Sequence, residues 1–324
     1  MDYRRLGHSG LKLSALSLGS WLTFAGTLSR GEVRRLVARA HEAGINFFDS
    51  AENYAFGAAE SMLGDVLTDL RLPRDHFCVS SKAFFGPEAE PRPTQRGLSR
   101  KHLREACDAA LRRLRVDYLD LFFCHRPDPD TPLEETVLAM DQLVRAGKVL
   151  YWGTSEWPAK ILCAAARFAR AHGLVGPSME QAQYNLLVRE RVELEYASLY
   201  DELGLGLTVW SPLASGLLSG KYAGGAIPAD SRLAALGSGW QPDFLQPEAR
   251  AAQAATVAQL MELAQTLDCS PATLAIAWCL RNPKVSSVIL GCSSLAQLEQ
   301  NLDALTLSSR LDARSLAQLD ALAT

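Results

Sequence analysis

The chain has 324 residues, which is long for an ordinary domain but within the range of a single α/β barrel. Its residues are 48% hydrophobic and 21% charged, a composition typical of a globular protein with a large core. The formal net charge of −3 gives no electrostatic sign of binding to nucleic acid or to an anionic membrane surface.

Seven cysteines are scattered along the chain without a C-x-x-C pair, and most lie within apolar runs. This usage favours a reducing compartment, so we expect a cytoplasmic protein without bound metal. The first 25 residues superficially resemble an export signal, but Lys12 and Gly19 interrupt the apolar stretch and no cleavage site follows. We therefore expect a folded N-terminus and no insertion into a membrane.

Segments typical of strands and helices alternate along almost the whole chain. The expected strands are 14–21, 45–50, 77–82, 118–125, 149–155, 179–185, 207–211 and 285–290. The expected helices between them are 29–43, 58–70, 99–115, 132–146, 159–171 and 190–203. Residues 11–14 alternate in polarity and indicate further β structure at the N-terminus, where we expect a β-hairpin.

Eight strand–helix units with nearly continuous apolar strands predict a parallel sheet covered by helices. Eight units favour closure into a (β/α)8 barrel, a TIM barrel of the α/β class, in one domain over residues 1–324. The segment between the seventh and eighth strands is longer than one strand–helix unit requires. It holds a long loop at 215–239 and extra helices at 248–267 and 272–280. A loop of that length is usually functional, and often a lid.

Ionisable side chains stand at the ends of three consecutive strands. Asp49 ends the second, Lys82 the third and His125 the fourth, while Tyr54 follows Asp49 by five residues. In a (β/α)8 barrel, the carboxyl ends of the strands surround the active site. Taken singly, Asp49 could cap a loop, Lys82 could be a surface lysine, Tyr54 a packing aromatic and His125 a structural histidine. Their joint placement favours a functional site.

These residue types suit carbonyl reduction. Hydride addition leaves an alkoxide that needs a proton, and a tyrosine can donate it. We expect the Lys82 ammonium to lower the pKa of Tyr54 and Asp49 to hold the lysine. His125 could then orient the substrate carbonyl or relay the proton.

The chain resembles the aldo-keto reductases over essentially its full length, closest to the branch that contains the voltage-gated potassium-channel β subunits and their bacterial relatives. The motifs that carry the resemblance are YRRLGHSGLKLSALSLGSW at 3–21, GINFFDSAENY at 44–54, LSRKHL at 98–103, YLDLFFCHRPDPDTPLEET at 118–136, YWGTSEW at 151–157, EQAQYN at 180–185, WSPLASGLLSGKY at 210–222 and LAIAWCLRNPKVSSVILGCSS at 274–294.

The resemblance implies a catalytic tetrad, and all four positions match: Asp49, Tyr54, Lys82 and His125. The channel subunits commonly have asparagine where this chain has His125, which favours catalysis here. Relatives bind an extended NADPH across the barrel mouth. A Rossmann site is not expected, because Gly204-Leu205-Gly206 lacks the third glycine of that motif.

The implied cofactor residues fall into three groups, besides Asp49. Around the nicotinamide stand Gly19, Ser20, Trp21, Ser155, Gln181 and the stacking Trp210. The pyrophosphate and 2′-phosphate side holds Ser211, Pro212, Leu213, Ser215, Gly216, Lys221, Ser231 and Arg232. The adenosine end holds Ser293, Gln297, Gln300 and Asn301, where a helix N-terminus is also expected to favour phosphate. Without the surrounding motifs, we would assign Trp210 to the barrel core and Lys221 and Arg232 to a solvated loop.

Three positions depart from the family pattern. Glu156 replaces asparagine or arginine near the nicotinamide, Gln300 replaces a glutamate, and Cys292 replaces a lysine that contacts the 2′-phosphate in many reductases. A preference for NADP over NAD therefore rests on Lys221 and Arg232. We expect an aromatic-rimmed pocket for apolar carbonyl substrates, formed by the long loop together with Trp21, Tyr54, Phe84, Phe85, His125 and Trp157.

Two alternatives remain beside the reductase. One is a regulatory subunit that binds NADP(H) and reports redox state to a membrane partner with slow turnover. The other is an aldolase-type barrel with Lys82 as a Schiff-base lysine, in which the cofactor motifs would have no role. The resemblance also implies assembly of copies of the chain into tetramers or larger rings.

Overall fold

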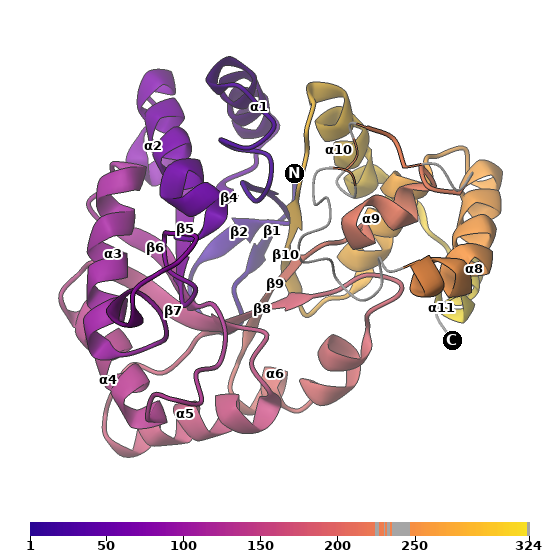
Figure 1. Ribbon diagram of the computed structural model, residues 1–324. Helices are drawn as coiled ribbons and strands as arrows, with labels where there is room; N and C mark the ends of the chain where they lie inside the picture. The colour runs from indigo at the N-terminus through magenta and orange to yellow at the C-terminus, as the bar shows by residue number, and fades with distance from the viewer. Residues whose placement is uncertain (224–226, 230, 232–233, 235–246, 323–324) are drawn as a thin grey trace.

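Eight parallel strands close into a barrel in the computed structural model (Figure 1), which describes residues 1–223, 227–229, 231, 234 and 247–322. The strand order around the barrel is β10-β3-β4-β5-β6-β7-β8-β9. The bounds are β3 Leu16–Gly19, β4 Phe47–Asp49, β5 Cys78–Ala83, β6 Leu119–Cys124, β7 Val149–Ser155, β8 Met179–Gln183, β9 Gly206–Trp210 and β10 Val285–Leu290. The predicted (β/α)8 fold is confirmed.

Helices cover the outside of the barrel. Their bounds are α1 Arg30–Glu42, α2 Ala58–Leu70, α3 Arg100–Leu114, α4 Leu133–Arg145, α5 Ala159–Ala171, α6 Leu199–Glu202, α8 Pro247–Thr266, α9 Pro271–Arg281, α10 Leu295–Arg310 and α11 Ala313–Ala321. The first begins as its sequence predicts: Ser29 and Glu32 form a capping box that satisfies free backbone N–H groups. Ser99, Ser270 and Ser294 likewise cap α3, α9 and α10.

The N-terminal hairpin closes one end of the barrel. Strands β1 (Tyr3–Arg5) and β2 (Lys12–Ser14) pair antiparallel, with Tyr3 opposite Ser14. Leu6 and Leu13 are fully buried in the cluster that fills the barrel interior. Phe47, Cys78 and Met179, each at the start of a strand, belong to the same cluster. The hairpin therefore covers the amino end of the barrel, and the carboxyl end is left for a site.

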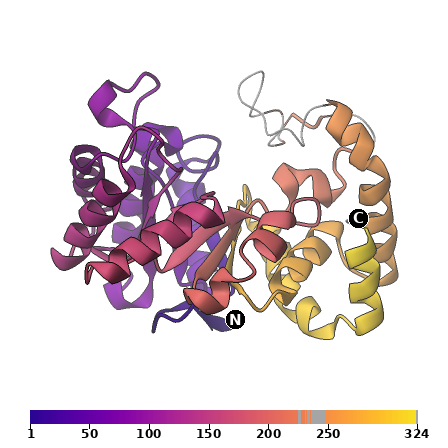
Figure 2. The ribbon, with the colours of Figure 1, turned by 90° about the horizontal axis from the view of Figure 1, so that it is seen from below.

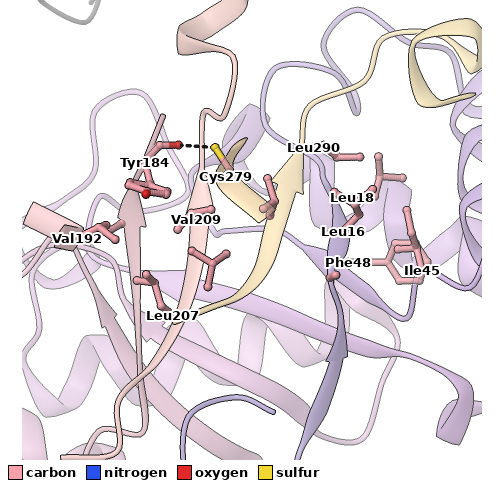
Figure 3. Packing of buried hydrophobic residues seen from close by; sticks show 14 of the residues in the cluster. Leu16, Leu18, Ile45, Phe48, Tyr184, Val192, Leu207, Val209, Cys279 and Leu290 are labelled. Carbon is pink, nitrogen blue, oxygen red and sulfur yellow. Dashed lines mark hydrogen bonds between the residues drawn. The ribbon is translucent and has the colours of Figure 1, made fainter. Parts of the chain in front are cut away.

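A second, larger apolar cluster lies between the strands and the helices. Figure 3 shows Leu16 and Leu18 of β3 in this layer, together with Leu207 and Val209 of β9. In the same view the thiol of Cys279, on α9, lies 3.6 Å from the backbone oxygen of Tyr184. Because strand side chains alternate, one face of each strand packs here and the other faces the interior.

The structure departs from the predicted helices in two places. Residues 190–203 do not form one helix: a π-helical turn, Arg191–Glu195, precedes the four-residue α6. For α10 only a helix N-terminus near Ser293 was predicted, without bounds, and α11 was not predicted. Figures 1 and 2 show α8 and α11 side by side, on the side of the molecule opposite α3 and α4. Of the predicted 215–239 loop, a 3-10 turn at Ala214–Ser219 is described, whereas 224–226, 230, 232–233 and 235–239 lie outside the described residues.

Candidate active site

Strand alternation directs the predicted catalytic side chains into the barrel. Phe47 and Cys78 belong to the interior cluster. Asp49 lies two residues after Phe47 and Lys82 four after Cys78, so both face the interior at the carboxyl end of their strands. The same alternation carries His125 inward after β6. It also applies to the other predicted residues on the strands: Gly19, Ser155, Gln181 and Trp210.

Lys82 is the centre of a buried polar cluster. Its ammonium nitrogen lies 2.7 Å from Asp49 Oδ2, 2.9 Å from the backbone oxygen of Ser50 and 3.2 Å from the Tyr54 hydroxyl. The other carboxylate oxygen of Asp49 accepts from Ser80 Oγ at 2.7 Å and from Gln181 Nε2 at 3.0 Å. The lysine is 0% exposed, so only a fully bonded arrangement of this kind compensates the cost of burying its charge.

Burial sets the protonation states of the cluster. Burial of the phenol raises the pKa of Tyr54, and the charge of Lys82 opposes part of that rise. Burial lowers the pKa of Lys82, but Asp49 and Tyr54 outweigh it and hold that pKa above its ordinary value. Burial, Lys82 and Arg126 together keep the pKa of His125 well below its ordinary value. The sign expected for Lys82 acting on Tyr54 is right, but the net direction is upward because burial dominates.

The tetrad opens into a cavity of about 410 Å³, which we call the reaction cavity. Three of the rings that line it are neighbours: the Tyr54 and His125 ring centroids lie 5.9 Å apart, and those of Phe85 and His125 lie 5.1 Å apart. Nδ1 of His125 is buried and has no hydrogen-bond partner among the described residues. The predicted residues that line this cavity are Gly19, Trp21, Asp49, Tyr54, Phe85, His125, Ser155, Gln181, Trp210 and Ser211.

A second cavity of about 330 Å³, the cofactor cavity, adjoins the first. Ser211, Ile289, Leu290 and Gly291 line both cavities, so the two are continuous. The predicted residues that line the second are Ser211, Pro212, Leu213, Ser215, Gly216, Lys221, Ser231, Ser293, Gln297, Gln300 and Asn301. Arg232 lies outside the described residues.

Three predicted residues lie elsewhere. Trp157 is 2% exposed and packs in the core between strands and helices. Phe84 packs against that same core and only its neighbour Phe85 reaches the reaction cavity. Ser20 is buried with its hydroxyl 2.9 Å from Ser50 Oγ, and it lines neither cavity. A residue just past a strand end follows the backbone of its loop, which strand alternation does not predict.

The unexpected carboxylate of Glu156 faces away from both cavities. Its Oε1 accepts from the backbone N–H of Gln183 at 2.6 Å and from the indole N–H of Trp210 at 2.9 Å. Its Oε2 pairs with Arg191 Nη1 at 2.5 Å. Glu156 therefore supports the ring that was predicted to stack on the nicotinamide, rather than facing that group with a negative charge.

Sequence reasoning missed several lining residues. In the reaction cavity the main omission is Arg126, next to His125. Asn53 was also missed, as were Ile289, Leu290 and Gly291, which line both cavities. In the cofactor cavity the omissions are Leu22, Thr23, Thr27, Ser219 and Ala272. The position of Arg126 directly after a charged strand end was a signal that could have identified it.

Cys292 and Glu52 have supporting contacts near the site. The thiol of Cys292 is buried and lies 3.3 Å from Asn301 Nδ2. Oε1 of Glu52 accepts from the backbone N–H groups of Phe84 and Gly86 at 2.8 and 2.9 Å. These bonds hold the loop that presents Phe85 to the cavity.

Two kinds of feature are absent from the described residues. No group of three or more His, Cys, Asp or Glu side chains there could hold a metal ion. Among those residues, no helix is long and apolar enough to cross a membrane.

A closed parallel barrel with a buried Asp, Tyr, Lys and His cluster at the carboxyl ends of its strands places the chain among the (β/α)8-barrel proteins. The model of the aldo/keto reductase family matches residues 15–324, and the chain belongs to that family. It is similar to a "Probable voltage-gated potassium channel subunit beta" of Oryza sativa subsp. japonica, with 46% identity over 94% of this chain and 91% of the relative. A protein of the same name from Arabidopsis thaliana is 44% identical over the same shares.

Proposed function

We propose that the chain is an NADPH-dependent reductase of aldehydes or ketones, with Tyr54 as the proton donor. One observation carries the proposal: the Tyr54 hydroxyl lies 3.2 Å from the buried ammonium of Lys82, at the wall of the reaction cavity. Asp49, 2.7 Å from the same ammonium, keeps the lysine charged.

The residues present suit an extended dinucleotide phosphate. The reaction and cofactor cavities are continuous, so one elongated molecule can occupy both. At the far end the amino terminus of α10, capped by Ser294, favours a phosphate. Lys221 lines the same cavity, and Ser215 Oγ is buried there without a hydrogen-bond partner among the described residues. When bound, NADPH supplies a hydride for the carbonyl carbon.

The tetrad handles the proton. As negative charge develops on the carbonyl oxygen, the Tyr54 hydroxyl donates its proton to that oxygen, and the product alcohol leaves with it. The Lys82 ammonium stabilises the tyrosinate that remains until solvent returns a proton. A neutral His125 has one N–H group, which can donate a hydrogen bond to the same oxygen and orient the carbonyl.

The test follows the nicotinamide absorbance with a panel of aldehydes and ketones, using NADPH and NADH in parallel. We expect loss of NADPH absorbance that depends on the aldehyde, and a drop in kcat of roughly 100-fold or more for Tyr54→Phe. Tyr3→Phe is the matched control, because the exposed Tyr3 donates only to the backbone oxygen of Gly44. Cofactor affinity should be unchanged in both variants. Cofactor binding without turnover of any carbonyl would contradict the proposal.

A second candidate follows from the names of the relatives. We propose as the alternative that the chain binds NADP(H) and regulates a membrane channel, since both compared relatives are named as probable channel β subunits. Co-purification with a co-expressed voltage-gated potassium channel, measured with NADPH or NADP+ present, tests this. Dependence of the complex on the oxidation state of the cofactor would support regulation; absence of a complex in both states would contradict it.

A further inference from the structure

Arg126 brings a guanidinium group to the wall of the reaction cavity. It follows His125 at the end of β6 and is half-buried. Its Nη1 donates to the backbone oxygen of His125 at 2.5 Å and to Ser155 Oγ at 3.3 Å. The guanidinium carbon lies 5.7 Å from the centroid of the Phe85 ring. Neither of its two hydrogen-bond acceptors carries a charge.

Two other partly buried arginines of this protein, Arg74 and Arg113, have carboxylate partners. Arg74 lies 2.6 Å from Asp120, and Arg113 lies 2.6 Å from Glu60. Within the part of the chain that the structure describes, no carboxylate lies at ion-pair distance from Arg126, and its Nε and Nη2 have no acceptor. Nε and Nη2 of Arg126 can therefore donate hydrogen bonds to a ligand.

The other charges of the reaction cavity are balanced. Asp49 lines the cavity and is paired with the buried Lys82. His125 is neutral, because burial and the neighbouring positive charges hold its pKa well below the ordinary value. The positive charge of Arg126 therefore has no counter-charge in the cavity, which Tyr54 also lines.

We propose that Arg126 binds a carboxylate carried by the substrate, so that aldehydes bearing a carboxylate group are the preferred substrates of this reductase. The inference rests on the reductase function proposed above. A planar guanidinium with two unused N–H donors matches the two oxygens of a carboxylate. Phe85 and Trp21 line the same cavity and supply contacts for the apolar body between the carboxylate and the carbonyl.

The experiment compares two aldehydes of nearly the same shape. Para-carboxybenzaldehyde carries the carboxylate, and para-formylbenzamide replaces it with a neutral amide. Values of kcat/KM for both are measured for the native protein, Arg126→Gln and Arg126→Lys. The control is Arg104→Gln, because Arg104 is exposed on α3, away from the cavity.

We expect the native protein to prefer the carboxylate substrate by about tenfold or more. Arg126→Gln should lower kcat/KM for that substrate by roughly 30-fold, the usual scale for truncating one partner of a charged pair. For the amide substrate, kcat/KM of Arg126→Gln should stay within a factor of about three of the native value, with KM for NADPH unchanged. For the carboxylate substrate, kcat/KM of Arg126→Lys should lie between the values of the native protein and Arg126→Gln. Equal losses on both substrates, or a change confined to KM for NADPH, would overturn the inference.

A binding measurement separates this inference from the reductase proposal. Para-(hydroxymethyl)benzoate, the alcohol of the carboxylate substrate, is titrated into the protein with NADP+ present, and quenching of tryptophan fluorescence is recorded. Weaker binding to Arg126→Gln than to the native protein supports the anion site even where no aldehyde is turned over. Turnover of both aldehydes without any difference in benzoate binding would reject the anion site and leave the reductase function intact.

Discussion

The Glu156 carboxylate accepts a hydrogen bond of 2.9 Å from the indole N–H of Trp210. This bond joins the end of β7 to the end of β9 at the mouth of the barrel. Glu156 adopts a left-handed backbone conformation (φ 59°), which a non-glycine residue holds only when its surroundings fix it. The partners of its carboxylate therefore determine where the Trp210 ring lies.

Glu156→Ala should loosen Trp210 and weaken cofactor binding. The ring loses its hydrogen bond, and the half-buried Arg191 loses a carboxylate partner. We expect KM for NADPH to rise about five- to tenfold, the scale of one charged hydrogen bond, with a smaller rise for Glu156→Gln, which keeps an acceptor. Glu195→Gln is the control, because Glu195 pairs with the same arginine but has no bond to the indole. A KM that changes equally in Glu195→Gln would show that only the ion pair matters.

Glu180 should make the stability of the fold depend on pH. Burial raises the pKa of its carboxyl to about 8, while the unfolded chain titrates near its ordinary value. Between those two pKa values the folded state holds a proton that the unfolded state releases. Stability is therefore full below the unfolded pKa and is lost as pH rises toward about 8.

The substitution Glu180→Gln removes this titration. An amide can still accept from the backbone N–H of Trp157, as Glu180 Oε1 does at 3.3 Å, and can donate to the Thr154 hydroxyl. We expect Tm to fall less between acidic and alkaline pH in Glu180→Gln than in the native protein. The exposed Glu262→Gln serves as control. Parallel Tm curves for all three proteins would refute this prediction.

The meeting of Asp49 and Lys82 was predictable from the sequence because a strand fixes its own side-chain directions, whereas Tyr54 lies in a turn and was assigned by resemblance. Once Asp49 and Lys82 are assigned to strand ends, the period of two and the parallel barrel bring them together. No comparable rule covers the next residues. After Ser155 the backbone turns through the positive φ of Glu156, and Trp157 enters the core instead of the pocket. The position of Trp157 therefore depends on the geometry of its loop, which tertiary contacts determine.

The helix predictions failed for two different reasons. Residues 190–203 have helical composition, but side-chain contacts redirect the chain: Glu195 accepts from the backbone N–H of Ala159, and the Tyr200 hydroxyl donates to the backbone oxygen of Val192. For α10 a signal was present, since the Ser294 side chain caps the backbone N–H of Gln297. The sequence prediction placed a helix N-terminus there but did not give the helix its length.

Phe85 and Trp157 should respond differently to substitution, although both were predicted to line the pocket. Phe85 is 40% exposed and lines the reaction cavity, whereas Trp157 is buried. We expect Phe85→Ala to change the ranking of aldehydes by kcat/KM with little change in Tm. Trp157→Phe should destabilise the fold by about 1 to 3 kcal/mol and leave the ranking unchanged. Thermal unfolding and a substrate panel on both variants check this, and a reversed pattern would place Trp157 in the pocket after all.

Lys221 should determine the choice between NADPH and NADH. It lines the cofactor cavity beside Gly216, where an added Cβ would approach the Lys221 Cε to 2.4 Å, so the glycine makes room for the lysine. A 2′-phosphate gains a charged contact there that NADH lacks. We expect Lys221→Met to raise KM for NADPH about tenfold or more and to leave KM for NADH nearly unchanged. Lys284→Met, which removes an exposed lysine paired with Asp201, is the matched control. A loss of equal size with both cofactors would mean that Lys221 contacts the pyrophosphate, which both share, and not the 2′-phosphate.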